Sequence, residues 1–184
     1  MKYIAILFFG IYVLLPFQNE TIAQDAPVIS NSRYLVKISV GQCRIWLYER
    51  NGRELKLIWE RKAGTAKFGL KRYPLGLGYI TDIDFAPVWK PTGYTRWYFA
   101  VKKRIFLPSM VPFGHKLNYM GAFRISISHF VPGKGSVYRI HGVRPGDEDC
   151  VGTRVSGGCI RMLNEEGLDL AKTVSVGTPV EIIP

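Results

Sequence analysis

Two short segments near the C-terminus, YRIHGV at residues 138–143 and SGGCIRM at residues 156–162, decide how this sequence is interpreted. The first is typical of a strand that ends at His141, and the second places Cys159 in a glycine-rich turn. A cysteine attacks as its thiolate, and a nearby imidazole that accepts the thiol proton increases the thiolate fraction. The glycines leave the backbone open, so the amides of Gly158 and Cys159 are candidate donors to an oxyanion. Spacing alone leaves open a buried core cysteine and a hydrogen-bonded strand histidine.

These segments resemble the signature of the L,D-transpeptidase catalytic domain (YkuD) family. The resemblance continues, in the family's order, through a hairpin at residues 45–59, a YPLGLGYI loop at residues 73–80 similar to TPxGxxxI, and a VGTPVEI ending at residues 176–182. It covers roughly residues 34–183, nearly the whole chain after its N-terminal segment. The resemblance implies a mostly β fold, an L,D-transpeptidase-like β-sandwich with one short helix after the cysteine. It also implies a cysteine enzyme that acts on peptidoglycan stem peptides and needs no cofactor or metal.

The resemblance also assigns roles to individual residues. Cys159 is the expected nucleophile and His141 the expected general base, with Gly158 and Cys159 as backbone oxyanion donors. Gly142 falls where some relatives use a backbone carbonyl to orient the histidine. The positions implied to shape the site or bind substrate are Ser156, Arg161 and Gly142. Arg161 has two open interpretations, a planar fork for a substrate carboxylate or a partner of a buried acid.

The implied reaction is acyl transfer from a tetrapeptide stem with loss of D-alanine. The acceptor stays open among a stem amine, a D-amino acid, a lipoprotein lysine and water. One residue departs from the family pattern, because Gly157 stands where the family commonly has histidine. That departure motivates an alternative, a catalytically impaired cell-wall-binding module of the same fold. A third hypothesis is a structural envelope protein whose cysteines are all structural.

Periodicity predicts the secondary structure around these segments. Alternation predicts strands at residues 34–40 and 178–183, and two apolar runs around Asn51-Gly52 predict a hairpin over residues 44–59. Frequent glycine and proline between residues 64 and 114 predict short strands and no long helix. One helix is predicted from Asn164, as its N-cap, to about residue 174.

The N-terminus predicts the compartment. Lys2 precedes an apolar run at residues 3–17, and small residues Thr21 and Ala23 follow, which is the pattern of a secretory signal peptide over residues 1–23. The alternative is an uncleaved membrane anchor, although the run is shorter than the ~20 residues that span a bilayer. We therefore expect an exported protein of the periplasm or cell envelope, with a polar lead at residues 24–33 and a catalytic domain at residues 34–184. Membrane contact is expected only through an uncleaved signal.

Length and charge limit the possible partners. A chain of 184 residues leaves room for one domain, and a net charge of +11 favours an anionic partner. The basic cluster at residues 102–104 and the aromatic segment at residues 87–99 carry no nucleic-acid motif, so we expect an anionic cell wall polymer and no nucleic acid. The aromatic segment is either a lid over the site or part of the core.

Three cysteines cannot all pair within one chain. Either all are free, or one pair is bridged and one thiol remains. We expect Cys159 to be the reactive thiol, with a pKa lowered by His141 and nearby amides, and Cys43 and Cys150 to be paired with each other or inert. His115 and His129 are expected to be surface or packing residues, since no metal-ligand spacing surrounds them.

Overall fold

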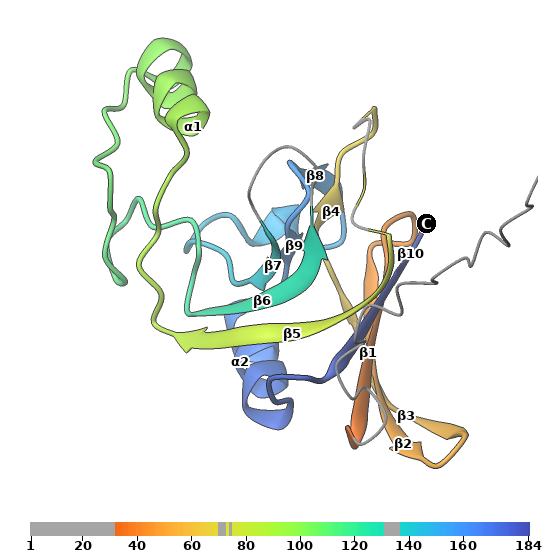
Figure 1. Cartoon of the computed structure of the whole chain (residues 1–184). Helices are drawn as coiled ribbons and strands as arrows, with labels where there is room; N and C mark the ends of the chain where they lie inside the picture. The colour runs from red at the N-terminus through yellow and green to blue at the C-terminus, as the bar shows by residue number, and fades with distance from the viewer. Residues whose placement is uncertain (1–31, 70–72, 74, 131–136) are drawn as a thin grey trace, which may run out of the picture.

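The computed structural model describes residues 32–69, 73, 75–130 and 137–184 (Figure 1). The expected signal peptide at residues 1–23 and nearly all of the polar lead lie outside the described residues.

Eight of the described strands form one curled sheet with the strand order β3-β2-β1-β10-β5-β6-β7-β9. Its strands are β1 (Tyr34–Ser39), β2 (Arg44–Asn51), β3 (Glu54–Lys62), β5 (Gly76–Phe85), β6 (Phe123–Phe130), β7 (Val137–His141), β9 (Ile160–Arg161) and β10 (Pro179–Ile183). Two strands, β4 (Thr65–Ala66) and β8 (Arg154–Ser156), pair separately. In Figure 1 the sheet bends along β5, so that β1, β2, β3 and β10 stand on one side and β6, β7 and β9 on the other. The prediction of a mostly β fold is confirmed.

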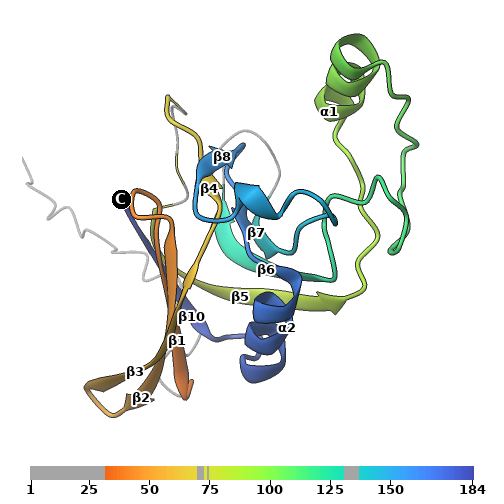
Figure 2. The same cartoon turned by 180° about the vertical axis from the view of Figure 1, so that it is seen from behind.

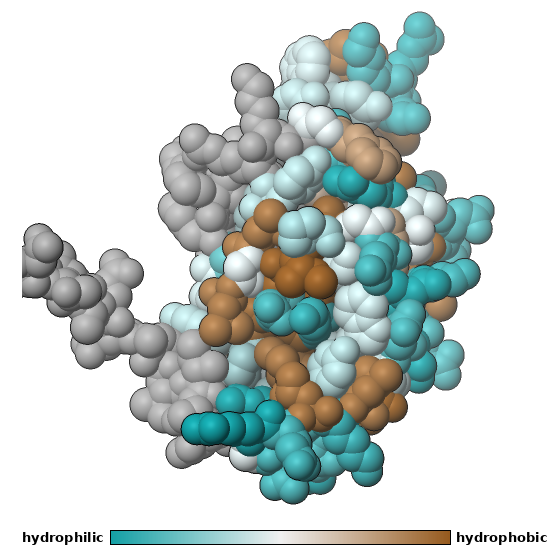
Figure 3. All heavy atoms as spheres, turned by 90° about the vertical axis from the view of Figure 1, so that its right-hand side faces the viewer, coloured by the Kyte–Doolittle hydropathy of each residue, from teal (hydrophilic) through white to brown (hydrophobic). Residues whose placement is uncertain are grey.

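The predicted hairpin is confirmed as β2 and β3, which pair antiparallel, with Asn51 opposite Glu54 and the turn at Gly52–Arg53. Gly52 has a φ of +61°, a left-handed conformation that glycine adopts without strain. The closing strand β10 lies parallel to β1 and antiparallel to β5, so the C-terminus joins the first strand to the rest of the sheet. Figure 3 shows the side of the molecule that carries the β1 to β3 layer, where apolar and hydrophilic side chains are mixed.

Alternation along the strands builds the main core. Ile45 and Leu47 of β2, and Phe123, Ile125 and Ile127 of β6, are all fully buried, while the residues between them are not part of the core. Successive side chains of a strand point to opposite faces, so each strand supplies one apolar face. Each such burial contributes about 1.5–3 kcal/mol. The opposite face of β6 and β7 is therefore free for polar residues.

The predicted helix after the cysteine is confirmed as α2 (Asn164–Thr173). It packs against the sheet (Figure 2). There Gly167 lies so close to the Phe123 ring that an added Cβ would overlap it. The predicted N-cap is wrong, because Leu163 is the cap residue and Asn164 is the first helical residue. The Asn164 side chain is used elsewhere, as described below. Among the described residues, no helix is long and apolar enough to cross a bilayer.

Residues 86–122, here called the lobe, connect β5 to β6 and contain a helical run that the sequence analysis missed. The run consists of α1 (Gly93–Tyr98) and the π-helix η2 (Phe99–Lys103). Thr92 caps its start by accepting a hydrogen bond from the Thr95 amide, at 3.1 Å. The lobe has its own small core of Trp89, Leu107 and Val111. A further short element is the 3-10 helix η3 (Glu148–Cys150).

Candidate active site

The parallel pairing of β7 and β9 brings the two signature segments together. Ile140 pairs with Ile160 and His141 pairs with Arg161. One residue earlier along both strands, Arg139 lies beside Cys159 and its backbone forms a hydrogen bond with the sulfur. Both isoleucines are fully buried in the core, so the alternating side chains of Arg139, His141 and Arg161 lie on the opposite face. With two residues along the strand and one strand across, the Cα atoms of Cys159 and His141 are about 8 Å apart, a distance that their side chains span.

The His141 ring is buried and oriented by the backbone. Its Nδ1 lies 2.7 Å from the carbonyl oxygen of Gly142, and because a carbonyl only accepts, Nδ1 carries the proton. The neutral ring therefore presents Nε2 as a proton acceptor. Burial, followed by the Arg161 charge, lowers the pKa of His141 to about 4, although the Gly142 hydrogen bond acts in the opposite direction. Neutral imidazole is the form of a general base.

Asn164 holds the peptide group that orients this histidine. Its Oδ1 accepts hydrogen bonds from the amides of Ala122, at 2.9 Å, and Val143, at 3.3 Å, and its Nδ2 donates to the carbonyl of Val143, at 2.8 Å. The Val143 amide belongs to the same peptide group as the Gly142 carbonyl that binds His141. Gly142 allows this approach, since a Cβ there would overlap Asn164 Oδ1. The sequence around Asn164 indicates only a helix cap, and no local pattern indicates this long-range contact.

The turn before Cys159 depends on Gly158. Its φ of +135° is one that side-chain-bearing residues rarely adopt, and an added Cβ would overlap the ring of Tyr138. The Gly158 amide donates to the hydroxyl of the buried Ser156, at 3.0 Å. That amide is therefore already used within the turn. Of the two expected oxyanion donors the Cys159 amide remains, and it lies beside its own sulfur, whose pKa it lowers. Gly157 differs, since nothing lies within 4 Å of an added Cβ.

The expected low pKa of Cys159 is not found. Burial of the thiol raises its pKa, and the charge of Arg139, an Arg139 amide hydrogen bond and the charge of Arg161 lower it by less. The sequence indicates donors near the sulfur but not its desolvation, which disfavours the thiolate. The resting pair is thus a neutral thiol beside a neutral imidazole.

Two arginines flank the pair. Arg161 is anchored through its backbone, which exchanges two hydrogen bonds of 2.8 Å with Gly64. Within the described part of the chain its guanidinium forms no ion pair, so the interpretation as the partner of a buried acid is not supported. Arg139 was missed by the sequence analysis, although the alternation of YRIH already places it on the same face as His141.

Of the expected substrate-binding residues, Ser156 and Gly142 are engaged within the protein, through the Gly158 amide and the His141 ring. Of the three, Arg161 is the residue whose side chain remains available to bind a ligand. All three cysteines are free, so the Cys43–Cys150 pair does not form here. Among residues 32–69, 73, 75–130 and 137–184, no cluster of metal-ligating side chains occurs.

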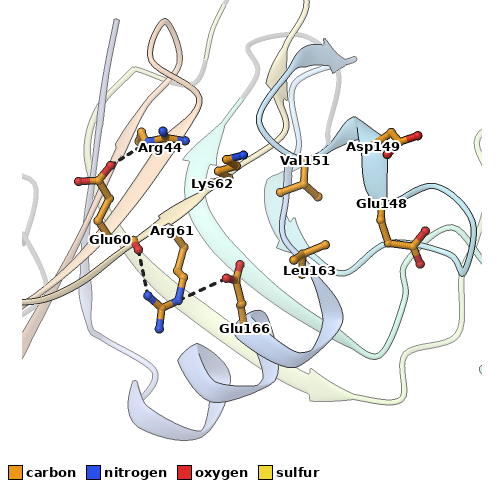
Figure 4. Close-up of a pocket in the computed structure, with 9 residues that line it drawn as sticks. All are labelled: Arg44, Glu60, Arg61, Lys62, Glu148, Asp149, Val151, Leu163 and Glu166. Atoms are coloured by element: carbon orange, nitrogen blue, oxygen red, sulfur yellow. Dashed lines mark hydrogen bonds and ion pairs between the residues drawn. The ribbon is translucent and has the colours of Figure 1, made fainter.

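A separate hollow of about 640 Å³ lies between β3, η3 and α2 (Figure 4). Four of the charged residues that line it form two ion pairs, as Arg61 contacts Glu166 at 3.4 Å and Arg44 contacts Glu60 at 2.8 Å. None of the predicted site residues lines it.

Known proteins resemble the chain in both sequence and structure. The family model of the L,D-transpeptidase catalytic domain matches residues 33–182. A probable L,D-transpeptidase ErfK/SrfK of Salmonella typhimurium is 30% identical over 188 residues, which cover 95% of this chain and 52% of that protein. The probable L,D-transpeptidase YcfS of Escherichia coli is 28% identical over 187 residues, which cover 95% and 49%. The chain thus spans about half the length of these curated relatives.

Solved structures show the same fold. Bd1075 of Bdellovibrio bacteriovorus superimposes with a TM-score of 0.57 at 22% identity, covering 83% of this chain and 48% of that one. The L,D-transpeptidase LdtMt1, solved in complex with imipenem, gives a TM-score of 0.55 at 16% identity, covering 83% and 59%. Because the family match spans nearly every described residue, including both segments that meet at β7 and β9, the chain belongs to the L,D-transpeptidase catalytic domain family.

Proposed function

We propose that the protein is an exported peptidoglycan L,D-transpeptidase that uses Cys159 as nucleophile and His141 as general base. The observation that carries this proposal is the β7 to β9 pairing, since His141 ends β7 and Cys159 directly precedes β9. Family membership supports the same class of reaction. The substrate we propose is a peptidoglycan tetrapeptide stem, and the acceptor is an amine or water.

The reaction proceeds in two acyl transfers. The Cys159 thiol gives its proton to His141 Nε2 while the sulfur attacks the carbonyl carbon between the third and fourth stem residues. The C–N bond then breaks, D-alanine leaves with the proton from His141, and a thioester remains. An acceptor amine or water attacks the thioester and gives its proton to His141, which returns it to the departing sulfur. The Cys159 amide is the proposed donor to the oxyanion in both steps.

The neutral resting pair suits this order of events. With the pKa of His141 near 4, the imidazole is free to accept a proton at neutral pH. The thiol, whose pKa burial raises, loses its proton as it attacks rather than beforehand. Arg161 is the proposed partner of the substrate carboxylate, because a guanidinium binds carboxylates through two parallel hydrogen bonds.

The purified protein should release D-alanine from a muropeptide with a tetrapeptide stem, and mass spectrometry separates a cross-linked dimer from a tripeptide product. Cys159→Ala should abolish release, and His141→Ala should reduce its rate by ~10²–10⁴-fold, as expected for loss of general acid–base catalysis. Cys150→Ala is the matched control, since this free cysteine lies in η3 and should leave the rate unchanged. Activity that survives in Cys159→Ala would contradict the mechanism.

The alternative, a catalytically impaired wall-binding module, is motivated by Gly157. The space around Gly157 is open, so Gly157→His should fold without displacing a neighbour. An inactive wild-type protein that binds wall sacculi and gains turnover in Gly157→His would favour the alternative.

We further propose that residues 1–23 are removed on export and that the mature protein begins at Gln24. Intact mass of material from envelope fractions tests this cleavage, and a mass that includes Met1 would indicate an anchor. The excess positive charge supports a location beside an anionic wall polymer.

A further inference from the structure

The helical run of the lobe carries an exposed apolar stripe. Tyr94, Trp97, Tyr98 and Val101 follow the i, i+3, i+4, i+7 spacing of one helix face. They are 73%, 53%, 38% and 55% exposed, and neither α1 nor η2 contains a buried residue. In a globular protein such a stripe normally faces the core. Here it faces outward.

The stripe is not needed to hold the lobe together. The lobe's own core is Trp89, Leu107 and Val111, and Trp89 and Val111 also exchange two backbone hydrogen bonds of 2.8 Å. Phe106, beside Leu107, is 87% exposed. The apolar side chains on the outside of the lobe are therefore additional to those that fold it.

The charge of the lobe has one sign. Residues 86–122 contain six lysines and arginines and no aspartate or glutamate, and these cations are Lys90, Arg96, Lys102, Lys103, Arg104 and Lys116. Three of them immediately follow the stripe. Figure 1 shows α1 projecting at the end of the molecule away from β1, β2 and β3, so a flat surface can approach it without meeting that layer.

We propose that the lobe is a docking surface for an anionic lipid bilayer, with the stripe and Phe106 entering the interface and the cations contacting lipid phosphates. Exposed aromatics on one helix face together with lysine and arginine are the features of helices that lie in the membrane interface. An anionic wall polymer would explain the charge but not the exposed stripe, so the bilayer is the partner that accounts for both. The proposal goes beyond the acyl-transfer function and does not depend on it, since none of these residues belongs to the site.

Hydrogen exchange of the full chain, with and without vesicles, tests the proposal. Reading protection only in residues 93–106 separates lobe docking from any binding by residues 1–23. We expect phosphatidylglycerol vesicles to slow exchange in this segment at least tenfold and phosphatidylcholine vesicles to slow it less than threefold. Unchanged exchange in residues 93–106 with anionic vesicles would overturn the proposal.

Variants separate the apolar contribution from the charge. Trp97→Ser with Phe106→Ser should remove most of the protection by anionic vesicles. The matched control, Leu55→Ser with Leu57→Ser, changes residues of β3 that are 50% and 48% exposed and should keep the protection. Lys102→Glu with Lys103→Glu should also remove the protection by anionic vesicles. If the charge variant loses protection while the aromatic variant keeps it, or if soluble poly(glycerol phosphate) protects the segment and vesicles do not, the partner is a polyanion and the bilayer proposal is wrong.

Discussion

Replacing Asn164 with alanine should reduce both stability and catalysis, and the two effects can be separated. The side chain makes three backbone hydrogen bonds, of 2.8, 2.9 and 3.3 Å. At ~0.5–1.5 kcal/mol net for each, Asn164→Ala should lower the free energy of unfolding by about 2–4 kcal/mol. The peptide group between Gly142 and Val143 then loses the contact that fixes it, and the carbonyl that orients His141 moves with it. A displacement of about 1 Å at a catalytic group can cost ~10²-fold in rate.

The assay compares kcat with KM for D-alanine release at a temperature where every variant is fully folded. Ser39→Ala is the control for stability alone. Ser39 is fully buried and bonded to the Pro184 carbonyl, at 2.8 Å, and the Gln42 amide, at 3.1 Å, on a strand separated from β7 by β10, β5 and β6. It should lose stability and keep kcat. Asn164→Asp keeps the acceptor oxygen for two of the three bonds and should recover part of kcat.

A purely structural role for Asn164 makes a different prediction. In that case Asn164→Ala and Ser39→Ala would lose stability and both keep kcat within twofold. An Asn164→Asp variant no more active than Asn164→Ala would likewise show that holding the Gly142 to Val143 peptide does not matter to the reaction.

Three further predictions concern the thiol and the glycines. Because burial raises the pKa of Cys159 above its ordinary value of 9.0, its alkylation rate should keep rising beyond pH 9, whereas a plateau near pH 7 would show a stabilised thiolate. Gly158→Ala should cost about 1–3 kcal/mol and most of the activity because its φ is +135°, while Gly157→Ala should be neutral in denaturant unfolding and turnover. Gly167→Ala should destabilise by about 1–3 kcal/mol in the same unfolding measurement, against the usual helix preference for alanine, because the methyl group meets the Phe123 ring.

Local patterns predicted the elements that local interactions determine. The strand predicted at residues 34–40 is Tyr34–Ser39, the strand predicted at residues 178–183 is Pro179–Ile183, and the predicted hairpin turns at Gly52, one residue later than an Asn-Gly turn. In each case the apolar alternation or the turn chemistry lies within a few consecutive residues. The helix after the cysteine was found for the same reason.

Features that depend on distant contacts were missed, and the pKa shift of Cys159 was predicted in the wrong direction. Pro91 and Gly93 were expected to prevent a helix. Instead a helix begins there, with Thr92 as its cap, and its apolar face points outward. Asparagine is a common helix cap, but the side chain of Asn164 instead accepts hydrogen bonds from backbone amides 21 and 42 residues away. The pKa of Cys159 depends on burial, which the sequence around a glycine-rich turn does not reveal.

The charges around the pair act on its two members in opposite ways. Arg161 lowers the pKa of His141, which opposes protonation of the base both at rest and as it accepts the thiol proton. Arg139 and Arg161 lower the pKa of Cys159, so they favour the anionic sulfur, although burial outweighs them in the resting enzyme. The negative charge that develops as the thiol gives up its proton therefore meets positive charges already in place. Stabilisation that acts on the developing anion more than on the resting thiol lowers the barrier to attack, which is how a half-buried, neutral cysteine can serve as a nucleophile.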